Sequence, residues 1–134
     1  MDKQIINPQS LVKPTGYAHG VVTQGGRLLF LAGQPALDAE GKVVAPGDIA
    51  AQFEQAFGNL KTVVEAAGGT MTDIVKLTLY VTNKAMYLAN LKPIGLVYRS
   101  FFGRYYPAMT LVEVKSLFDD AALVEIEGLA VLPE

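Results

Sequence analysis

Two carboxylates close to the C-terminal end are the clearest candidates for chemistry. Glu125 and Glu127 lie two residues apart in the run VEIEGLA, so on a strand both side chains point to the same side of the sheet. Val124, Ile126 and Ala130 would then point to the opposite side, toward the helices. A carboxylate partly removed from water needs donors or a proton, which suits it to hold a water molecule or to transfer a proton. The alternative is a pair of edge charges or an ion pair between subunits.

Three further residues are candidates for a ligand site. Gly33 and Gln34 follow an apolar run, where a glycine either lets backbone groups approach a ligand or simply ends the strand. His19 is the single histidine, and it is either a proton carrier near neutral pH or a locally hydrogen-bonded residue. One histidine and no cysteine argue against a metal site, and no motif indicates a cofactor.

The elements that must position these residues follow from the periodicity of the apolar residues. Two β-rich runs flank Gly25 and Gly26, which predicts a β-hairpin. Alternation and β-branched residues indicate the other strands. The predicted strands span residues 19–24, 27–33, 42–44, 73–82, 109–115 and 123–132.

Two helices are predicted between these strands. The first spans residues 49–67 with one broad apolar stripe, follows Asp48 as its N-cap and ends before Gly68. The second spans residues 93–102, because Pro93 is tolerated only in the first turn of a helix. Both helices carry a single stripe to bury, so both are expected on the same face of the sheet.

The order of these elements predicts an α+β fold, with a mixed β-sheet and two helices on one face. A length of 134 residues fits a single domain spanning residues 1–134. With 51% hydrophobic and 18% charged residues, the chain is richer in apolar surface than a small monomer needs. We therefore expect the uncovered sheet face to meet another subunit in a closed oligomer.

Composition also excludes several classes of function. Without cysteine there is no disulfide scaffold, no thiolate metal site and no cysteine nucleophile. The net charge of −2 comes from 11 basic and 13 acidic residues without a basic stripe, so we expect no nucleic-acid partner. The apolar runs are too short for a membrane span, and the first residues do not form a signal peptide. The expected location is cytoplasmic.

Over nearly its whole length the sequence resembles the RidA/YjgF family. The matching segments, in order, are Asn7-Pro8, Gly16-Tyr17-Ala18-His19, LFLAGQP at 29–35, Gln52, Asn59-Leu60-Lys61, EAAG at 65–68, Ile74-Val75-Lys76-Leu77-Thr78, Pro107-Ala108 and VEIEG at 124–128. Their order and spacing together make the resemblance specific.

The resemblance implies a homotrimer of chorismate-mutase-like α+β subunits, with a small-molecule cleft at each subunit interface. The best-known family members hydrolyse reactive enamines and imines to keto acids and ammonia. The resemblance assigns Glu125 to positioning the attacking water and Tyr17 to lining the cleft. We place Gly33, Gln34 and Thr110 with the ligand-binding residues.

Two departures from the family pattern concern the ligand. The family has an arginine after the Pro-Ala pair that grips the substrate carboxylate, but this chain has Met109, whose thioether donates no hydrogen bond. Arg104 either replaces that arginine from the preceding loop or stays in solvent. The family's cleft asparagine has Asn90 as the nearest candidate, although counting back from Tyr98 reaches Gly95.

Two functional hypotheses therefore remain open. The first is a hydrolase or deaminase of an enamine, imine or related small metabolite with an altered substrate preference. The second is a non-catalytic trimer of the same fold that binds a small molecule or a partner protein. The retained Glu125 favours the enzyme, and Met109 favours a changed ligand or loss of catalysis.

Overall fold

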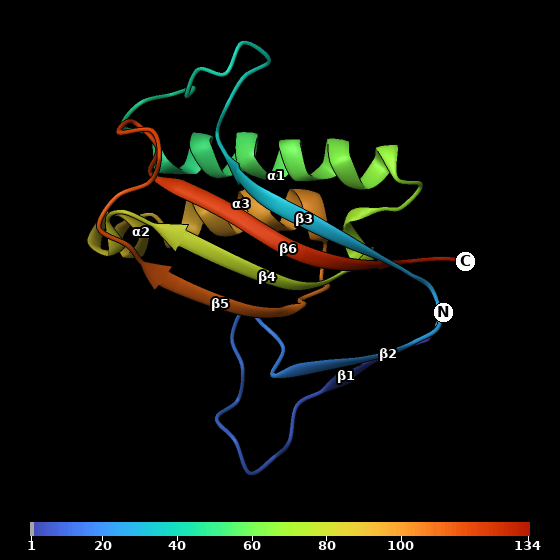
Figure 1. Ribbon diagram of the computed structural model, residues 1–134. Coiled ribbons are helices and arrows are strands. Elements are labelled where there is room, and N and C mark those ends of the chain that lie inside the picture. The colour runs from blue at the N-terminus through green and yellow to red at the C-terminus, as the bar shows by residue number, and fades with distance from the viewer. Residues whose placement is uncertain (1) are drawn as a thin grey trace.

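A four-stranded sheet carries two helices on one face in the computed structural model, which describes residues 2–134 (Figure 1). The strands are in the order β3 (Arg27–Pro35), β6 (Val124–Leu132), β4 (Ile74–Val81) and β5 (Ala108–Glu113). Strand β4 is parallel to β5 and antiparallel to β6, and β6 is antiparallel to β3, so the sheet is mixed. The covering helices are α1 (Ile49–Ala66) and α3 (Leu91–Phe102). The predicted fold class is confirmed.

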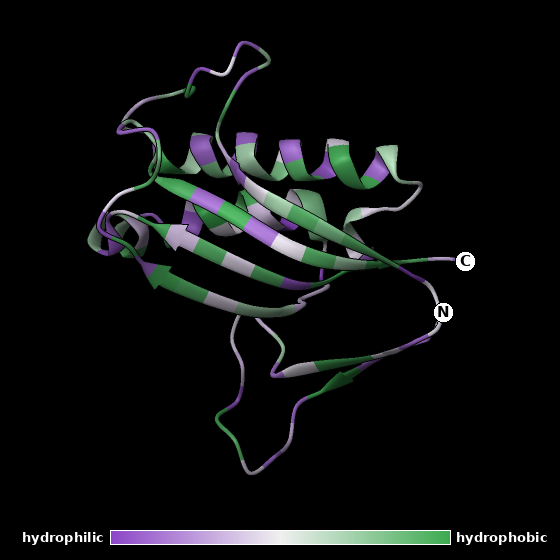
Figure 2. Cartoon of the chain, in the orientation of Figure 1, coloured by the Kyte–Doolittle hydropathy of each residue, from purple (hydrophilic) through white to green (hydrophobic). Residues whose placement is uncertain are grey.

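Helix α1 forms where the sequence provides a cap and an apolar stripe. The Asp48 side chain accepts a hydrogen bond from the Ala51 N–H at 3.1 Å, which satisfies one of the free donors of the first turn. Hydrophobic and hydrophilic residues alternate along the helix (Figure 2), and Phe53, Phe57 and Leu60 are fully buried. Each such side chain contributes roughly 1.5–3 kcal/mol through burial. The helix ends before Gly68, whose φ of 91° suits a glycine.

Strands β4 and β6 supply the other half of this core. Leu77, Leu79 and Val81 of β4 are buried beneath the helices, as are Val124 and Ile126 of β6. The intervening residues point to the other face of the sheet because side chains alternate along a strand. The alternation predicted for VEIEGLA is therefore confirmed.

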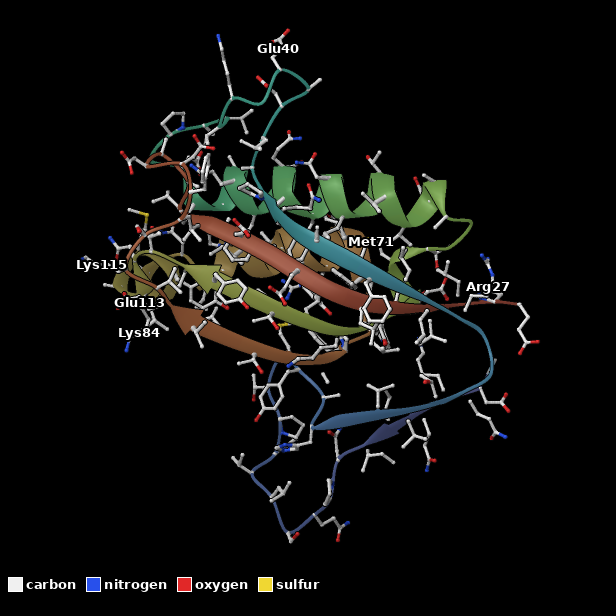
Figure 3. All side chains as sticks on the ribbon, in the orientation of Figure 1. Arg27, Glu40, Met71, Lys84, Glu113 and Lys115 are labelled. Carbon is white, nitrogen blue, oxygen red and sulfur yellow. The ribbon has the colours of Figure 1, made fainter. Side chains whose placement is uncertain are left out.

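The segment after β4 divides into two helices. Asn83 caps α2 (Lys84–Ala89) by accepting a hydrogen bond from the Met86 N–H at 2.9 Å. The Lys84 N–H donates to the Glu113 carboxylate at 2.7 Å, which ties the start of α2 to the end of β5, where Figure 3 labels both residues. Pro93 is the third residue of α3, within the first turn, as predicted.

The N-terminal region corrects the prediction of a hairpin through Gly25 and Gly26. Strand β2 (Gly20–Gln24) pairs with β1 (Asp2–Ile6), which the sequence did not indicate, and the two form a separate sheet. The glycines have φ values of 76° and 85°, and they redirect the chain from one sheet into the other. The β-rich character of residues 19–24 was recognised, but β character does not specify which strand is the partner.

Two smaller elements also differ from expectation. The strand predicted at residues 42–44 is only an isolated bridge between Leu37 and Val43, because the surrounding segment is a loop. A short 3-10 helix, η1 (Met71–Asp73), precedes β4. Neither change alters the sheet that carries the candidate site.

Gln52 holds two loops against the core. It is fully buried, and its Nε2 donates to the Ala45 carbonyl at 3.3 Å in the loop before α1. In the loop before β6, the same Nε2 donates to the Ala121 carbonyl at 3.0 Å, and Oε1 accepts from the Leu123 N–H at 2.8 Å. One side chain of α1 therefore holds both the loop before this helix and the loop that leads into β6.

We expect Gln52→Leu to lower the free energy of unfolding by about 2–4 kcal/mol, because it leaves buried backbone groups without partners. Urea denaturation measures this difference. Glu54→Leu, at an exposed position of the same helix, is the control and should change stability by about 0.5 kcal/mol or less. A loss below about 1 kcal/mol in Gln52→Leu would show that the loops are held by other contacts.

Candidate active site

Glu125 and Glu127 lie on the sheet face opposite the helices. Both side chains are half-buried, whereas Val124 and Ile126 beside them are fully buried. Glu125 is in register with Tyr80, and Glu127 with Thr78. Hydrogen bonding to Glu127 raises the pKa of Tyr80, and the negative charges of Glu127 and Glu125 add to the effect. This face of the sheet therefore collects acidic and hydroxyl groups.

Gly33 allows the Glu125 carboxylate to lie against strand β3. The pairing of β3 with β6 shifts register between Leu31 and Gln34, and Pro35 is then opposite Glu125. A Cβ added to Gly33 would lie 2.9 Å from the Cδ of Glu125. Gly33 is thus needed for the close approach of the Glu125 carboxylate of the same chain, and its role in ligand binding stays a prediction.

Thr110 lies on this same outer face, on β5 at the opposite edge of the sheet from β3. It is in register with Thr78, and its hydroxyl accepts a hydrogen bond from the Lys76 Nζ at 2.8 Å. Glu125, Gly33, Lys76 and Thr110 therefore form the outer-face group. Gln34 is half-buried at the β3 irregularity, in register with Ile126.

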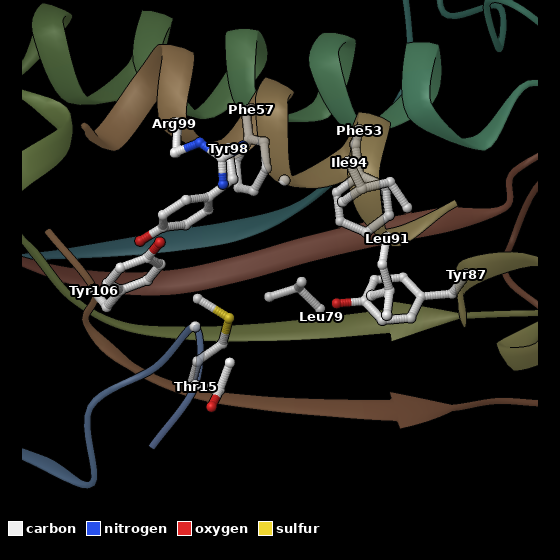
Figure 4. Close-up of a pocket in the computed structure, with 13 residues that line it drawn as sticks. Thr15, Phe53, Phe57, Leu79, Tyr87, Leu91, Ile94, Tyr98, Arg99 and Tyr106 are labelled. Carbon is white, nitrogen blue, oxygen red and sulfur yellow. The ribbon is translucent and has the colours of Figure 1, made fainter. Parts of the chain in front are cut away.

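Met109 points the other way, toward the helices. It is in register with the buried Leu77, and it packs against the core beneath α3. Here it borders a pocket of about 340 Å³, within the range of small-molecule sites. The lining residues, which we call the helix-face pocket (Figure 4), are Thr15, Gly16, Phe53, Phe57, Leu79, Tyr87, Leu91, Ile94, Gly95, Tyr98, Arg99, Tyr106 and Met109.

Stacked tyrosines form one end of the helix-face pocket. The rings of Tyr98 and Tyr106 are parallel within 2°, with centroids 5.0 Å apart. The Tyr98 hydroxyl donates to the Tyr105 carbonyl at 2.6 Å, and the Tyr105 hydroxyl donates to the Ile74 carbonyl. Burial raises the pKa of Tyr98 above its usual range and raises the pKa of Tyr105 to about 12. Tyr98 and Tyr105 therefore stay neutral near neutral pH. We call Tyr98, Tyr105 and Tyr106 the tyrosine wall, of which Tyr98 and Tyr106 line the pocket.

Tyr17 and Arg104 lie in an adjacent hollow. It has a volume of about 310 Å³ and shares Gly16 and Tyr106 with the helix-face pocket. The segment is held in place because the Ala18 N–H donates to the Pro107 carbonyl at 3.0 Å. The structure thus brings Tyr17 and Arg104 together in a hollow that Met109 does not line.

His19 and Asn90 make local contacts. The His19 Nε2 lies 2.7 Å from the Val12 carbonyl oxygen, in agreement with the local alternative for this histidine. The Asn90 Nδ2 donates to the Met86 carbonyl at 2.8 Å, at the junction of α2 and α3, and Asn90 does not line the helix-face pocket. Gly95 lines the pocket, at the position reached by counting back from Tyr98.

Sequence reasoning missed Arg99 and most of the aromatic lining. Arg99 follows Tyr98, a residue that the predicted helix already placed inward, and it lies one turn after Gly95. That spacing places residues 95 and 99 on one side of a helix, which is the signal that could have identified Arg99.

The outer-face group and the helix-face pocket lie on opposite sides of one sheet. Met109 shares a face with Leu77, whereas Glu125 shares a face with Tyr80, and adjacent residues of a strand point to opposite faces. Within one chain, a ligand in the helix-face pocket cannot touch Glu125.

Comparison with known proteins identifies the family. The family model described as endoribonuclease L-PSP matches residues 8–132. The chain is 35% identical to the 2-iminobutanoate/2-iminopropanoate deaminase of Escherichia coli, over 98% of each chain. The chain belongs to the RidA/YjgF family.

Solved structures of the RidA/YjgF family agree with this assignment. The Rid-family protein YyfB of Yersinia pestis is 36% identical, with a TM-score of 0.88 over 98% of this chain and 100% of that chain. The yjgF gene product of Escherichia coli is 35% identical, with a TM-score of 0.66 over 93% of each chain.

Two classes of site are not found in the part of this RidA/YjgF chain that the structure describes. Within residues 2–134, no group of three or more histidine, aspartate or glutamate side chains is placed to hold a metal ion. No helix in the same range is long and apolar enough to cross a membrane.

The tyrosine wall gives a testable pH dependence. Burial, with a smaller contribution from the charge of Asp73, raises the pKa of Tyr105 from 10.0 to about 12, so the folded chain holds this proton more tightly than the unfolded chain. The resulting stabilisation is complete below pH 10 and is lost as the pH rises toward 12. We expect the free energy of unfolding to fall across this range, and to fall less steeply in Tyr105→Phe. Urea denaturation at several pH values tests this, and equal slopes for both proteins would contradict it.

Proposed function

We propose that this protein is a hydrolytic deaminase of a small imine or enamine, with its site at the interfaces of a homotrimer. The observation that carries the proposal is the half-buried Glu125 carboxylate beside Gly33, on a chain of the RidA/YjgF family. Residues 1–134 form one domain in this proposal, and the location is cytoplasmic. The deaminase name of the Escherichia coli relative supports the reaction class.

The proposed reaction adds water to the carbon of a C=N bond. Glu125 accepts a proton from the water as its oxygen bonds to that carbon, and the C=N electron pair moves to nitrogen, which takes a proton. The resulting carbinolamine loses ammonia as the C=O bond forms. The overall change is an imine and water to a carbonyl compound and ammonia, without an oxidant or a cofactor. An enamine enters the same sequence after protonation at carbon.

A second subunit is needed to bring the two parts of this site together. The outer-face group and the helix-face pocket are separated by the sheet, so one chain would supply Glu125 and its neighbour would supply the pocket. Leu28 and Phe30 of β3 are 63% and 75% exposed on the outer face, and burying them in an interface would be favourable. Cyclic symmetry would then create an equivalent cleft at each interface.

Met109 supports an altered substrate preference. The resemblance places a carboxylate-binding arginine at this position, and two charge-assisted hydrogen bonds of about 1.5–3 kcal/mol each are lost with a thioether. Tyr17, Arg104, Gln34 and Thr110 remain proposed ligand-binding residues around the cleft. Asn90 would take part only indirectly, through the junction of α2 and α3. The absence of the arginine also favours the second candidate, a trimer that binds a metabolite without turnover.

Hydrolysis of freshly generated 2-iminopropanoate tests the proposal. We expect slow turnover by the wild type and a gain of at least about tenfold in kcat/KM for Met109→Arg, because the guanidinium restores the carboxylate contact. Adding Glu125→Gln to Met109→Arg should abolish the gain, whereas adding Glu40→Gln, at an exposed loop position, should not.

Three outcomes would contradict parts of this account. A wild type as fast as Met109→Arg would refute the altered preference. Full activity after Glu125→Gln would refute the role of that carboxylate. Inactivity of the wild type and Met109→Arg on all imines, with retained ligand binding, would favour the non-catalytic candidate.

A further inference from the structure

The helix-face pocket contains a single charged residue among those that the structure describes. Of its 13 lining residues only Arg99 is charged, and none is acidic. Aromatic and aliphatic side chains make up most of the remaining surface, with Thr15 as a polar exception. A guanidinium that faces an apolar pocket without a carboxylate in that pocket attracts an anion from solution. The lining thus indicates a ligand with one negative group and an apolar body.

The Arg99 guanidinium lies beside Gly95. The two residues are four apart on α3, and a Cβ added to Gly95 would lie 3.4 Å from the Arg99 Nη1. A Cβ at this distance would be close to ordinary van der Waals contact with the flexible end of the side chain. Arg99 is an exposed residue, so its guanidinium lies along the helix at the open edge of the pocket and is accessible to a ligand from solution.

The charged residue of the pocket and part of its apolar lining lie at opposite ends. Figure 4 shows Arg99 at the same end as Tyr98 and Tyr106, while Tyr87 and Leu91 lie at the other end. Met109 lines the pocket from the strand side and donates no hydrogen bond. The only side-chain group in this lining that can pair with a carboxylate through two parallel N–H donors is therefore on the helix wall.

We propose that Arg99 binds the carboxylate of an organic acid whose aromatic or branched aliphatic body fills the helix-face pocket. This inference rests on the proposed function, because the acid is the imino-acid substrate or its keto-acid product. The proposed substrates are 2-imino acids with a large apolar side chain. Their carboxylate would bind to Arg99 on α3, whereas the resemblance places the carboxylate-binding residue on β5. The carboxylate of such a ligand pairs with the Arg99 guanidinium. Its apolar body displaces water from the tyrosine wall.

Binding of phenylpyruvate, measured by calorimetry, tests the inference without requiring turnover. We expect wild type to bind phenylpyruvate at least about tenfold more tightly than phenylacetone, in which a methyl group replaces the carboxylate. Pyruvate, which lacks the apolar body, should also bind at least about tenfold more weakly. Arg99→Met should lose the preference for phenylpyruvate over phenylacetone, and Arg99→Lys should retain part of it.

Two further variants keep the test decisive. Lys92→Met removes a positive charge from an exposed position of α3 outside the pocket lining, and it should bind phenylpyruvate like the wild type. Gly95→Leu keeps Arg99 but adds a branched side chain at a residue that lines the pocket, so it should leave less room for the ligand and also weaken phenylpyruvate binding at least about tenfold. Thermal melting confirms that each variant is folded.

The failure of this inference is distinguishable from the failure of the proposed function. Equal phenylpyruvate affinity in Arg99→Met and wild type, or no binding by wild type, overturns the inference and leaves imine hydrolysis open. Binding that depends on Arg99, without turnover of any imine, upholds the inference for the ligand and overturns the catalytic proposal.

Discussion

Strand β6 places apolar side chains on the helix face and carboxylates on the outer face at alternating residues. The candidate site depends on both sets. Val124 and Ile126 are fully buried beneath the helices, which fixes the strand at the centre of the sheet. Because side chains alternate, Glu125 and Glu127 must then point to the other face. A shift of β6 by one residue would bury both carboxylates in the core and expose two apolar residues. The core thus fixes the direction of the carboxylates.

The same alternation separates the two parts of the proposed site within one chain. Strand β5 is aligned with β4 so that Met109 joins Leu77 on the helix face, where α3 and the segment around Gly16 complete a pocket. The carboxylate lies across the thickness of the sheet. Assembly in the proposed trimer would place the Glu125 of one subunit over the pocket of the next, so oligomerisation and catalysis would depend on the same contacts.

Much of the fold could be predicted from the sequence because its signals are local. Asp48, the apolar stripe of α1 and the first-turn position of Pro93 each specify structure within a few residues. The pairing of β2 was predicted wrongly, since Gly25 and Gly26 permit both a hairpin and a redirected chain. Strand partners are chosen by contacts distant in sequence, and those contacts leave no local pattern.

In the candidate site, too, features set by neighbouring residues could be predicted, and features set by contacts distant in sequence could not. The shared direction of Glu125 and Glu127 followed from a two-residue spacing, whereas the contact of Gly33 with Glu125 depends on a strand pairing that is distant in sequence. Arg99 was missed because its place in the pocket depends on Tyr106 and Met109, which lie outside α3 and are brought to it by the fold. Asn90 was chosen by proximity in sequence, yet it joins two helices instead of lining the pocket.

Mixed oligomers test most directly whether the site is shared between subunits. One chain would carry Glu125→Gln, and the other Gly95→Trp, which fills the helix-face pocket without touching the outer face. Each variant alone should be inactive toward the imine of phenylpyruvate. After co-refolding in equal amounts, about one quarter of the clefts would combine an intact carboxylate with an intact pocket, so about one quarter of wild-type activity should return. No recovery in confirmed mixed oligomers would contradict a site built from two chains.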